Sequence, residues 1–425
     1  MIKNIIIVGV GNIGFRHLES LLKIKRKLRV IVCDQSTYQL KKTKEKITII
    51  NKKKHCVEFY KKIDSFQFSF DLAIVATPAD VRKEVISKLI QKNKIRNLII
   101  EKIAFNKLTE YRFALNQIRK KNIKAYVNFP RREMDSYKDL KQKIIKLKNF
   151  VISNIGFNWG LATNSLHMLD LLSYFSNERI FVLNSSLSNK IFKSSRNRFM
   201  EFKGILRFLT KKQNLLLLED IDIKMNDKKL LGGIKIETEK KDFIIYEDKH
   251  QLLEIIKNKN NLTIKKHRFE FLLQSKMTKK VVENIFLKKK VNLPTLEDSY
   301  QNHKIFINIL KIHLKKISKN NTVKYPKLEP RVETVRRVVA LPEYKRAYFG
   351  FFEAKSFNFD DEVHNLTQLI AEPRQKECFK EGNFVYRRLE LEQNLKFASL
   401  NPKDAAEKYW KSSKVIPQHL LDYIR

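Results

Sequence analysis

The sequence contains few cysteines for its length and no long apolar runs. Its three cysteines, Cys33, Cys56 and Cys378, are too few and too scattered among 425 residues for a disulfide framework or a metal cluster. The histidines show no metal-ligand spacing, and no stretch approaches the roughly 18 apolar residues that span a bilayer. The N-terminus lacks a signal-peptide pattern. We therefore expect a cytoplasmic protein of a reducing compartment, with no bound metal and no membrane partner.

Acidic residues are also scarce, with 45 against 87 basic residues and a formal net charge of +42. Such charge suits a nucleic-acid surface. It is spread through almost every segment, however, and accompanies abundant Ile and Asn, so a base-composition bias is the favoured explanation. Because no basic arm, zinc knuckle or aromatic RNA-binding signature is present, we expect no nucleic-acid partner. The charge also fits anionic substrates such as phosphates or nucleotide-linked sugars.

The first part of the chain alternates short Ile/Val-rich runs with longer Lys-rich helical patterns. Continuous apolar strands separated by helices predict a parallel sheet that is covered on both faces. We therefore expect a doubly wound α/β Rossmann domain over residues 1–130. The expected strands are Asn4–Val8, Arg29–Cys33, Leu72–Ala76, Leu98–Ile100 and Ala125–Asn128.

The pattern changes after about Phe150. A helical stretch, "TNSLHMLDLLSYF", precedes residues 180–290, which alternate mostly as strands, and Thr295 is placed to begin a further helix. We expect an α+β domain with a largely antiparallel open sheet over 131–330. Residues 331–425 have a different composition and no chemical motif, and an added domain, a helical interaction module and a fused segment all stay open.

The stretch "IIIVGVGNIGFRH" places three glycines directly after the first expected strand. Gly9, Gly11 and Gly14 form G-x-G-x-x-G before a helical pattern. The first glycine allows a tight turn, the second lets a pyrophosphate approach, and the third lets helix and strand pack closely. The phosphates would lie at the helix N-terminus, where free N–H groups favour anions. We expect these glycines, together with Asn12 and Ile13, to contact a dinucleotide.

An acidic residue supports this interpretation of the loop. Asp34 ends the second expected strand, twenty residues after Gly14, where a carboxylate binds the adenosine ribose hydroxyls. Because the carboxylate would repel a 2′-phosphate, it favours NAD over NADP. Lys41 and Lys42 lie nearby and would weaken that preference.

Several motifs in one order resemble the glucose-fructose oxidoreductase and inositol dehydrogenase (Gfo/Idh/MocA) family. They are "GVGNIGFRHL", "VATPAD", "EKIAFN", "NFPRR", "NWGLATNSLHMLDLL" and "LPTLEDSYQNHKIF", within residues 1–330. The resemblance implies a Rossmann domain followed by a substrate domain whose open sheet often forms an oligomer interface. It also implies hydride exchange between a nicotinamide cofactor and a carbinol carbon of a sugar or a related compound.

The resemblance further implies roles for individual residues. Ala76, Thr77 and Pro78 match the loop that passes the cofactor. Glu101 and Lys102 match the family's Glu-Lys-Pro, whose lysine points at the reacting centre and whose residues adjoin the cofactor.

His167 matches the family's histidine near the nicotinamide. The chain departs from the family in two places, because Ile103 replaces the usual proline and Thr163 replaces an aspartate four residues before the histidine. Threonine cannot take up a proton at neutral pH. Asn164 fits a subset of amino-sugar or surface-polysaccharide enzymes and is a candidate substrate contact.

The ordinary acid–base chemistry of these side chains predicts different roles for His167, Lys102 and Asp170. An unperturbed histidine titrates near pH 6.5, so His167 suits the role of base or orienting group. Lys102 suits polarisation of the hydroxyl or sharing of its proton. Asp170 lies on the same helical face as His167 and would either fix its tautomer or serve a structural role.

Arg131 and Trp159 complete the candidate substrate contacts. Arg131 and Arg132 follow a strand at the edge where ligands of such sheets bind, and one of them could hold a carboxylate or phosphate. Exposed arginines that begin a helix are the alternative. Trp159 would stack on a sugar face or belong to the core.

Three functions remain to be compared. The first is an NAD-dependent oxidoreductase of a sugar or sugar derivative, with NADP less favoured, in polysaccharide synthesis; its partners would be a small sugar-type substrate and further copies of the chain. The second is a catalytically degenerate dinucleotide-binding regulatory or scaffold protein. The third, nucleic-acid binding, is least favoured.

Overall fold

The computed structural model describes residues 2–51, 54–147, 149–194, 199–221, 230–258 and 261–319. The chain divides into two compact units. The first comprises Met1–Ser186 and Gly204–Asn308, and it contains both large sheets. The second comprises Leu187–Lys203 and Ile309–Arg425. The expected extension over 331–425 lies outside the described residues.

The N-terminal sheet has six parallel strands in the order β3-β2-β1-β5-β7-β8. This order is that of the doubly wound dinucleotide-binding fold, with its reversal between β1 and β5. The five strands expected from the apolar runs are confirmed to within a residue or so, and β3 is an addition. The bounds are β1 Lys3–Val8, β2 Leu28–Cys33, β3 Cys56–Tyr60, β5 Leu72–Val75, β7 Asn97–Glu101 and β8 Lys124–Asn128.

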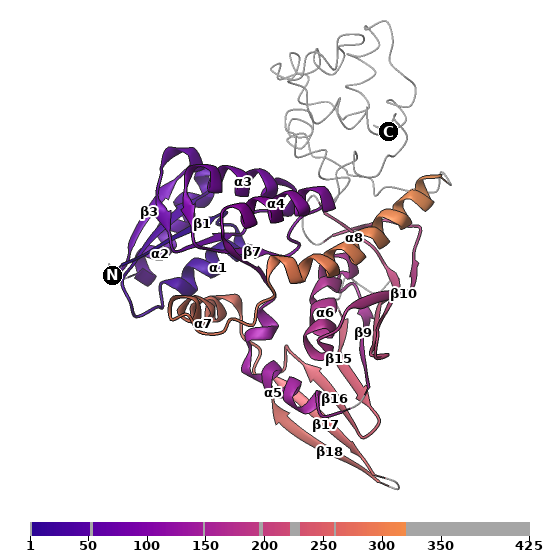
Figure 1. Cartoon of the computed structure of the whole chain (residues 1–425). Coiled ribbons are helices and arrows are strands. Elements are labelled where there is room, and N and C mark those ends of the chain that lie inside the picture. Colours follow the sequence, from indigo (N-terminus) through magenta and orange to yellow (C-terminus); the bar gives the residue numbers. More distant parts are fainter. Residues whose placement is uncertain are drawn as a thin grey trace, which may run out of the picture. The chain divides into compact units, whose positions relative to one another are not determined.

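Helices cover both faces of this sheet. In Figure 1, α3 (Ala79–Lys92) and α4 (Leu108–Lys120) lie on one side, and α1 (Asn12–Leu21) lies on the other. Because both faces are covered, the central strands are apolar throughout, as β1 shows with Ile5 and Ile6 both fully buried. The remaining elements are α2 (Thr37–Asn51), η1 (Ile63–Ser65), β4 (Ser69–Phe70) and β6 (Lys94–Ile95).

The second sheet has eight strands in the order β10-β13-β14-β9-β15-β16-β17-β18. Of the six strand pairs from β13 to β18 whose register is described, β14–β9 is parallel and the other five are antiparallel, which confirms the expected, largely antiparallel character. Helix α6 (Leu161–Ser176) packs against β14. The strands are β9 Phe150–Phe157, β10 Ile180–Leu187, β13 Gly204–Thr210, β14 Leu215–Ile221, β15 Leu230–Thr238, β16 Lys241–Tyr246, β17 Gln251–Lys257 and β18 Leu262–Arg268.

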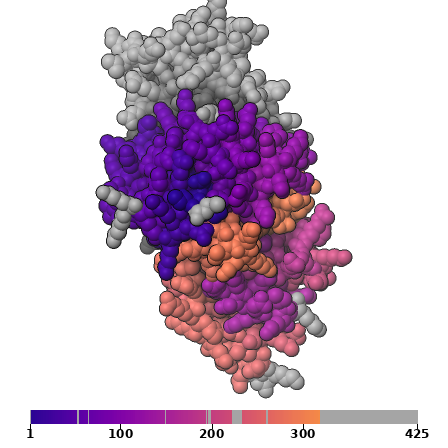
Figure 2. Space-filling view, turned by 60° about the vertical axis from the view of Figure 1, so that its left-hand side comes forward, coloured from indigo at the N-terminus to yellow at the C-terminus, as the bar shows by residue number. Residues whose placement is uncertain are grey.

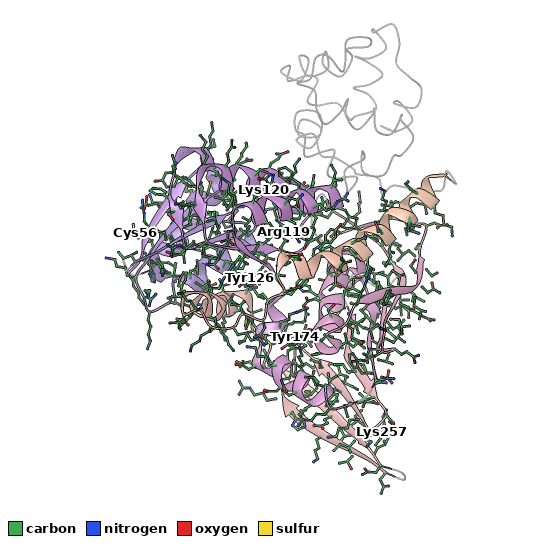
Figure 3. The ribbon with its side chains drawn as sticks, in the orientation of Figure 1. Cys56, Arg119, Lys120, Tyr126, Tyr174 and Lys257 are labelled. Carbon is green, nitrogen blue, oxygen red and sulfur yellow. The ribbon has the colours of Figure 1, made fainter. Side chains whose placement is uncertain are left out.

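Two short helices join the domains. The 3-10 helix η2 (Pro130–Glu133) and helix α5 (Asp135–Ile144) follow directly on β8. Tyr126, labelled on β8 in Figure 3, pairs with Thr295 in an isolated antiparallel bridge. The end of the Rossmann sheet therefore contacts the start of a helix about 170 positions later.

Helix α7 (Gln274–Phe286) was not expected, because residues 180–290 read mostly as strands. It packs on α1, and its Val281 and Val282 belong to the same buried cluster as Leu18. Figure 2 shows orange atoms of the later chain directly against indigo atoms of the N-terminus. The Rossmann domain thus takes one of its covering helices from beyond residue 270.

Helix α8 (Leu296–Lys319) begins where the sequence predicts. The amide of Asp298 donates to Thr295 Oγ1 at 3.0 Å, and the Thr295 hydroxyl donates to the Asp298 carboxylate at 2.6 Å. These bonds satisfy helix-end groups that have no intrahelical partner. In the second unit, β11 (Phe192–Lys193) pairs with β12 (Met200–Glu201).

Candidate functional site

The glycine loop lies where the strand order reverses, and each glycine has a different environment. Gly9 has φ +87°, and a Cβ built there would lie 2.9 Å from the amide nitrogen of Thr77. A Cβ on Gly14 would lie 1.8 Å from the carbonyl oxygen of Gly9. A Cβ on Gly11 would meet nothing within 4 Å. Gly9 therefore turns the chain, Gly14 packs helix on strand, and Gly11 leaves its approach open.

Two helices begin at this point. Helix α1 follows Gly11, and α3 follows Pro78, without a side-chain cap at either end. Gly11, Asn12 and Pro78 are exposed, whereas Ile13 is partly buried. Free N–H groups at helix starts attract phosphate. An open approach at Gly11 beside uncapped helix ends fits a dinucleotide pyrophosphate.

Asp34 lies beside the same loop. Its Oδ2 accepts a hydrogen bond from the amide of Val10 at 2.7 Å, and its Oδ1 accepts one from the amide of Ser36 at 2.8 Å. Each carboxylate oxygen has a further acceptor site. Asp34 thus organises the glycine loop while it remains partly exposed, as a ribose-binding carboxylate must be.

Glu101, at the end of β7, belongs to a buried polar network. Its Oε1 lies 2.8 Å from His17 Nε2 on α1 and accepts a hydrogen bond from Asn128 at the end of β8. Asn128 also donates to Gln274 of α7 at 2.9 Å. Burial alone would raise the pKa of Glu101, but His17, Asn128 and the charge of Arg82 hold that pKa below its usual range. The residue before Lys102 is therefore held as an anion.

Lys102 extends from this network to the second domain. Its Nζ donates a hydrogen bond to the backbone carbonyl oxygen of Thr163 at 2.8 Å. Thr163 lies in the first turn of α6, four residues before His167. The fold therefore brings Lys102 to the first turn of the helix that carries His167. The Lys102–Ile103 peptide bond is cis.

Helix α6 is mostly buried but carries one accessible polar stripe. Thr163, Asn164 and His167 are partly exposed, whereas eleven other residues of the helix are buried. Positions separated by three and four residues share a helix face. The His167 ring makes an edge contact with Phe129, with 5.5 Å between ring centroids. Lys102 contacts the backbone of this helix at Thr163, the first residue of the stripe.

Asp170 takes the structural role that the sequence left open for it. Its Oδ2 accepts a hydrogen bond from Arg132 Nε at 2.9 Å. Burial raises the pKa of Asp170, and the charge of Arg132 opposes that rise. The Arg132 guanidinium also lies 5.2 Å from the ring centre of Tyr174, which Figure 3 labels. Arg132 thus fixes α6 to the segment that follows β8.

The structure places the three candidate substrate contacts in polar pairings of their own. Arg131 donates to both carboxylate oxygens of Glu247 at 2.7 Å, and its role as a substrate contact stays a prediction. Trp159 is 2 % exposed, and its indole N–H donates to the carbonyl of Glu219. Asn164 donates from Nδ2 to the carbonyl of Trp159 at 2.6 Å, although its side chain stays partly exposed.

Sequence reasoning missed His17 and Asn128. Both lie inside motifs singled out for other residues, "GVGNIGFRHL" and "NFPRR". Asn128 could have been found as a polar residue at the end of a parallel strand, where ligands of such sheets gather. For His17 no signal exists in the sequence, because its partner Glu101 is 84 positions away.

Metal sites and membrane spans are both missing from the part of the chain that the structure describes. No group of three or more His, Cys, Asp or Glu side chains there is arranged to hold a metal ion. No helix in that part is long and apolar enough to cross a bilayer.

Residues 3–129 match the model of an oxidoreductase family, Gfo/Idh/MocA, described as having an NAD-binding Rossmann fold. The expected resemblance is therefore confirmed over that range. A search of curated proteins finds no significant match.

Solved structures share the fold at low sequence identity. A super-repressor mutant of Gal80p from Saccharomyces cerevisiae has 14% identity and a TM-score of 0.59, over 74% of this chain and 97% of that chain. UDP-N-acetylglucosamine 3-dehydrogenase GnnA from Acidithiobacillus ferrooxidans has 10% identity and a TM-score of 0.54, over 74% and 97%. The 3-ketoreductase KijD10 from Actinomadura kijaniata, solved with TDP-benzene and NADP, has 11% identity and a TM-score of 0.53, over 72% and 96%.

Proposed function

We propose that this chain, whose residues 3–129 belong to the Gfo/Idh/MocA family of NAD-binding oxidoreductases, moves a hydride between a nicotinamide cofactor and a carbinol carbon of a sugar or sugar derivative. The observation that carries the proposal is the contact of Lys102 Nζ with the start of α6, beside the partly exposed His167. A glycine loop alone would support cofactor binding only. A lysine that extends from the cofactor domain to the polar stripe of α6 supports a catalytic role as well.

Separate groups of residues would bind the cofactor and act on the substrate. Gly9, Gly11, Asn12, Ile13 and Gly14 would hold the pyrophosphate, and Asp34 the ribose hydroxyls, which favours NAD over NADP. When bound, the cofactor supplies the hydride acceptor or donor. Lys102 stabilises charge that develops on the substrate oxygen, and His167 accepts or orients its proton. A nucleotide-linked sugar of a polysaccharide pathway is the substrate class that we favour.

A dinucleotide-binding regulator is the second candidate. Thr163 replaces the family's aspartate and cannot take up a proton at neutral pH, so this position supplies no acid or base. Gal80p, named as a repressor, shows that the same fold occurs in a regulatory protein. In this alternative the cofactor site binds without turnover.

A second copy of the chain is the proposed protein partner. Helix α6 covers one face of the large sheet, whereas Ile155, Leu217, Ile244 and Leu253 are partly exposed on the strands of the other face. Ile155 alone is 39 % exposed. A charge at that position, as in Ile155→Glu, should lower the molar mass measured by light scattering. A wild-type monomer would contradict the proposal.

The test of the main proposal is a fluorescence titration with NADH and NADPH. We expect saturable binding of NADH, weakened by Asp34→Ala, and NADH formation with a nucleotide sugar that disappears with Lys102→Ala. Failure to bind either cofactor would overturn both candidates. Binding without turnover on any sugar nucleotide would leave the regulator as the better proposal.

A further inference from the structure

The most deeply buried arginine of the Rossmann domain lies directly behind the candidate site. Arg82, on α3, is 2 % exposed. Burial lowers its pKa to about 10, and the charges of Glu101 and Asp80 partly oppose that change. Withdrawal of a guanidinium from water costs several kcal/mol in free energy. The burial of Arg82 therefore requires hydrogen bonds that compensate for the lost hydration.

The contacts of Arg82 supply those hydrogen bonds. Its Nη1 donates to the carbonyl oxygens of Glu101 at 2.6 Å and Ala104 at 2.9 Å, and also to that of Ile103. Its Nη2 donates to the carbonyl oxygen of Thr77. One planar group therefore joins two loops that follow different strands. An apolar side chain in this place would remove the donors that Arg82 supplies to these four carbonyl oxygens.

The lysine loop, residues 101–104, is also held from its other side. The amide of Ala104 donates to His303 Nε2 at 3.1 Å, and His303 Nδ1 donates to the carbonyl of Ser299 at 2.9 Å. These bonds fix a neutral tautomer, because Nε2 must accept and Nδ1 must donate. Burial lowers the pKa of His303 to about 4. Arg82 thus donates to carbonyl oxygens of the lysine loop, and His303 accepts from the amide of its last residue, Ala104.

We infer that Arg82 is a positioning residue that fixes the lysine loop to the cofactor loop, residues 76–78. With both loops attached to one guanidinium, Lys102 keeps a constant distance from the bound cofactor. Lysine cannot replace it, since an ammonium is a single point whereas the guanidinium donates in a planar fork. The catalytic consequence rests on the proposed function; the joining of the two loops does not.

Hydrogen exchange tests the joining without any substrate. The amides of Ala76 and Ala104 report on the two loops, because they donate to Val8 O and His303 Nε2; the amide of Val127, which donates to Pro294 O, reports on the sheet. In Arg82→Ala we expect exchange at both loop amides to rise together by about tenfold or more, with a smaller rise at Val127. Guanidinium ion at a non-denaturing concentration should slow both again, and ammonium should not.

Lys88→Ala, an exposed change on the same helix, is the matched control and should leave all three rates unchanged. If Arg82→Ala does not fold, Arg82→Lys takes its place, with the same coupled increase expected at both loops. An equal rise at all three amides, or a rise in one loop alone, would overturn the inference.

Once a substrate that the protein turns over is identified, kinetics provides a second test. Arg82→Lys should lower kcat by a larger factor than it raises the dissociation constant of NADH. Loss of loop protection in a chain that binds no cofactor would uphold the joining and reject the proposed function.

Discussion

The side-chain amine of Lys102 and the backbone carbonyl of Thr163 lie 2.8 Å apart, although 61 positions separate them in sequence. The bond connects the end of strand β7 with the first turn of α6. It places a cationic donor from the cofactor domain beside the partly exposed polar stripe of the second domain. The mechanism proposed above depends on this contact.

Removal of that amine should strongly reduce turnover and spare cofactor binding. We expect Lys102→Ala to reduce kcat/KM by about 10² to 10⁴-fold, the range of a lost polarising or proton-transfer group. NADH affinity should change little, because the glycine loop is untouched. The control is Lys120→Ala, an exposed change at the end of α4 that Figure 3 labels. Equal activity in both variants would contradict the role of Lys102.

The glycines of the loop should respond differently to one added methyl group. In Gly14→Ala the new Cβ would lie 1.8 Å from the Gly9 carbonyl oxygen, so we expect a clear fall in thermal stability. Gly11→Ala meets nothing within 4 Å and should cost no more than about 1 kcal/mol, the price of a poorer helix cap. It should still weaken NADH binding, because the pyrophosphate would approach there. Unimpaired binding by a folded Gly11→Ala variant would argue against the site.

Arg131 distinguishes substrate contact from structural pairing. The Arg131 and Glu247 side chains are 16 % and 21 % exposed, so Arg131→Ala leaves a mostly buried carboxylate with the neutral Tyr137 hydroxyl in place of a cationic partner. We expect a loss of about 3 to 5 kcal/mol in the free energy of unfolding. Arg131→Met/Glu247→Leu should recover only part of this loss, because the buried Tyr137 hydroxyl then lacks its acceptor. Urea unfolding measures the free energy of unfolding of both variants. A higher substrate KM with unchanged stability would instead support the substrate role predicted from the sequence.

His303 should make stability depend on pH in the mildly acidic range. Its pKa is about 4 in the folded protein against an ordinary 6.5, so the unfolded chain binds the proton first as pH falls. The stabilisation is complete above pH 6.5 and is lost as pH falls towards 4. By linkage this amounts to about 3 kcal/mol. His303→Gln does not titrate and should flatten urea-unfolding free energies over this range; an unchanged slope would contradict the assignment.

Local patterns in the sequence predicted much of the fold. Apolar runs such as Asn4–Val8 and Leu72–Ala76 are buried on both faces, so composition alone marks them as parallel strands. The roles of Gly9 and Gly14 follow from the turn between strand and helix, which is local too. Thr295 begins α8 through a bond to Asp298 three residues away. In each case the determining interaction lies within a few positions of the residue.

The long-range partners of the polar residues follow from the packing of distant elements, which no local pattern specifies. Arg131 pairs with Glu247, 116 positions away, and His17 with Glu101. Helix α7 has an apolar face that no local rule assigns to α1, and only their packing makes it part of the Rossmann core. Partner choice depends on how separate elements are brought together, and hydrophobic burial drives that assembly without regard to sequence distance. Local sequence patterns therefore specify the elements and the glycine loop, whereas packing specifies which charged groups are paired and which face the site.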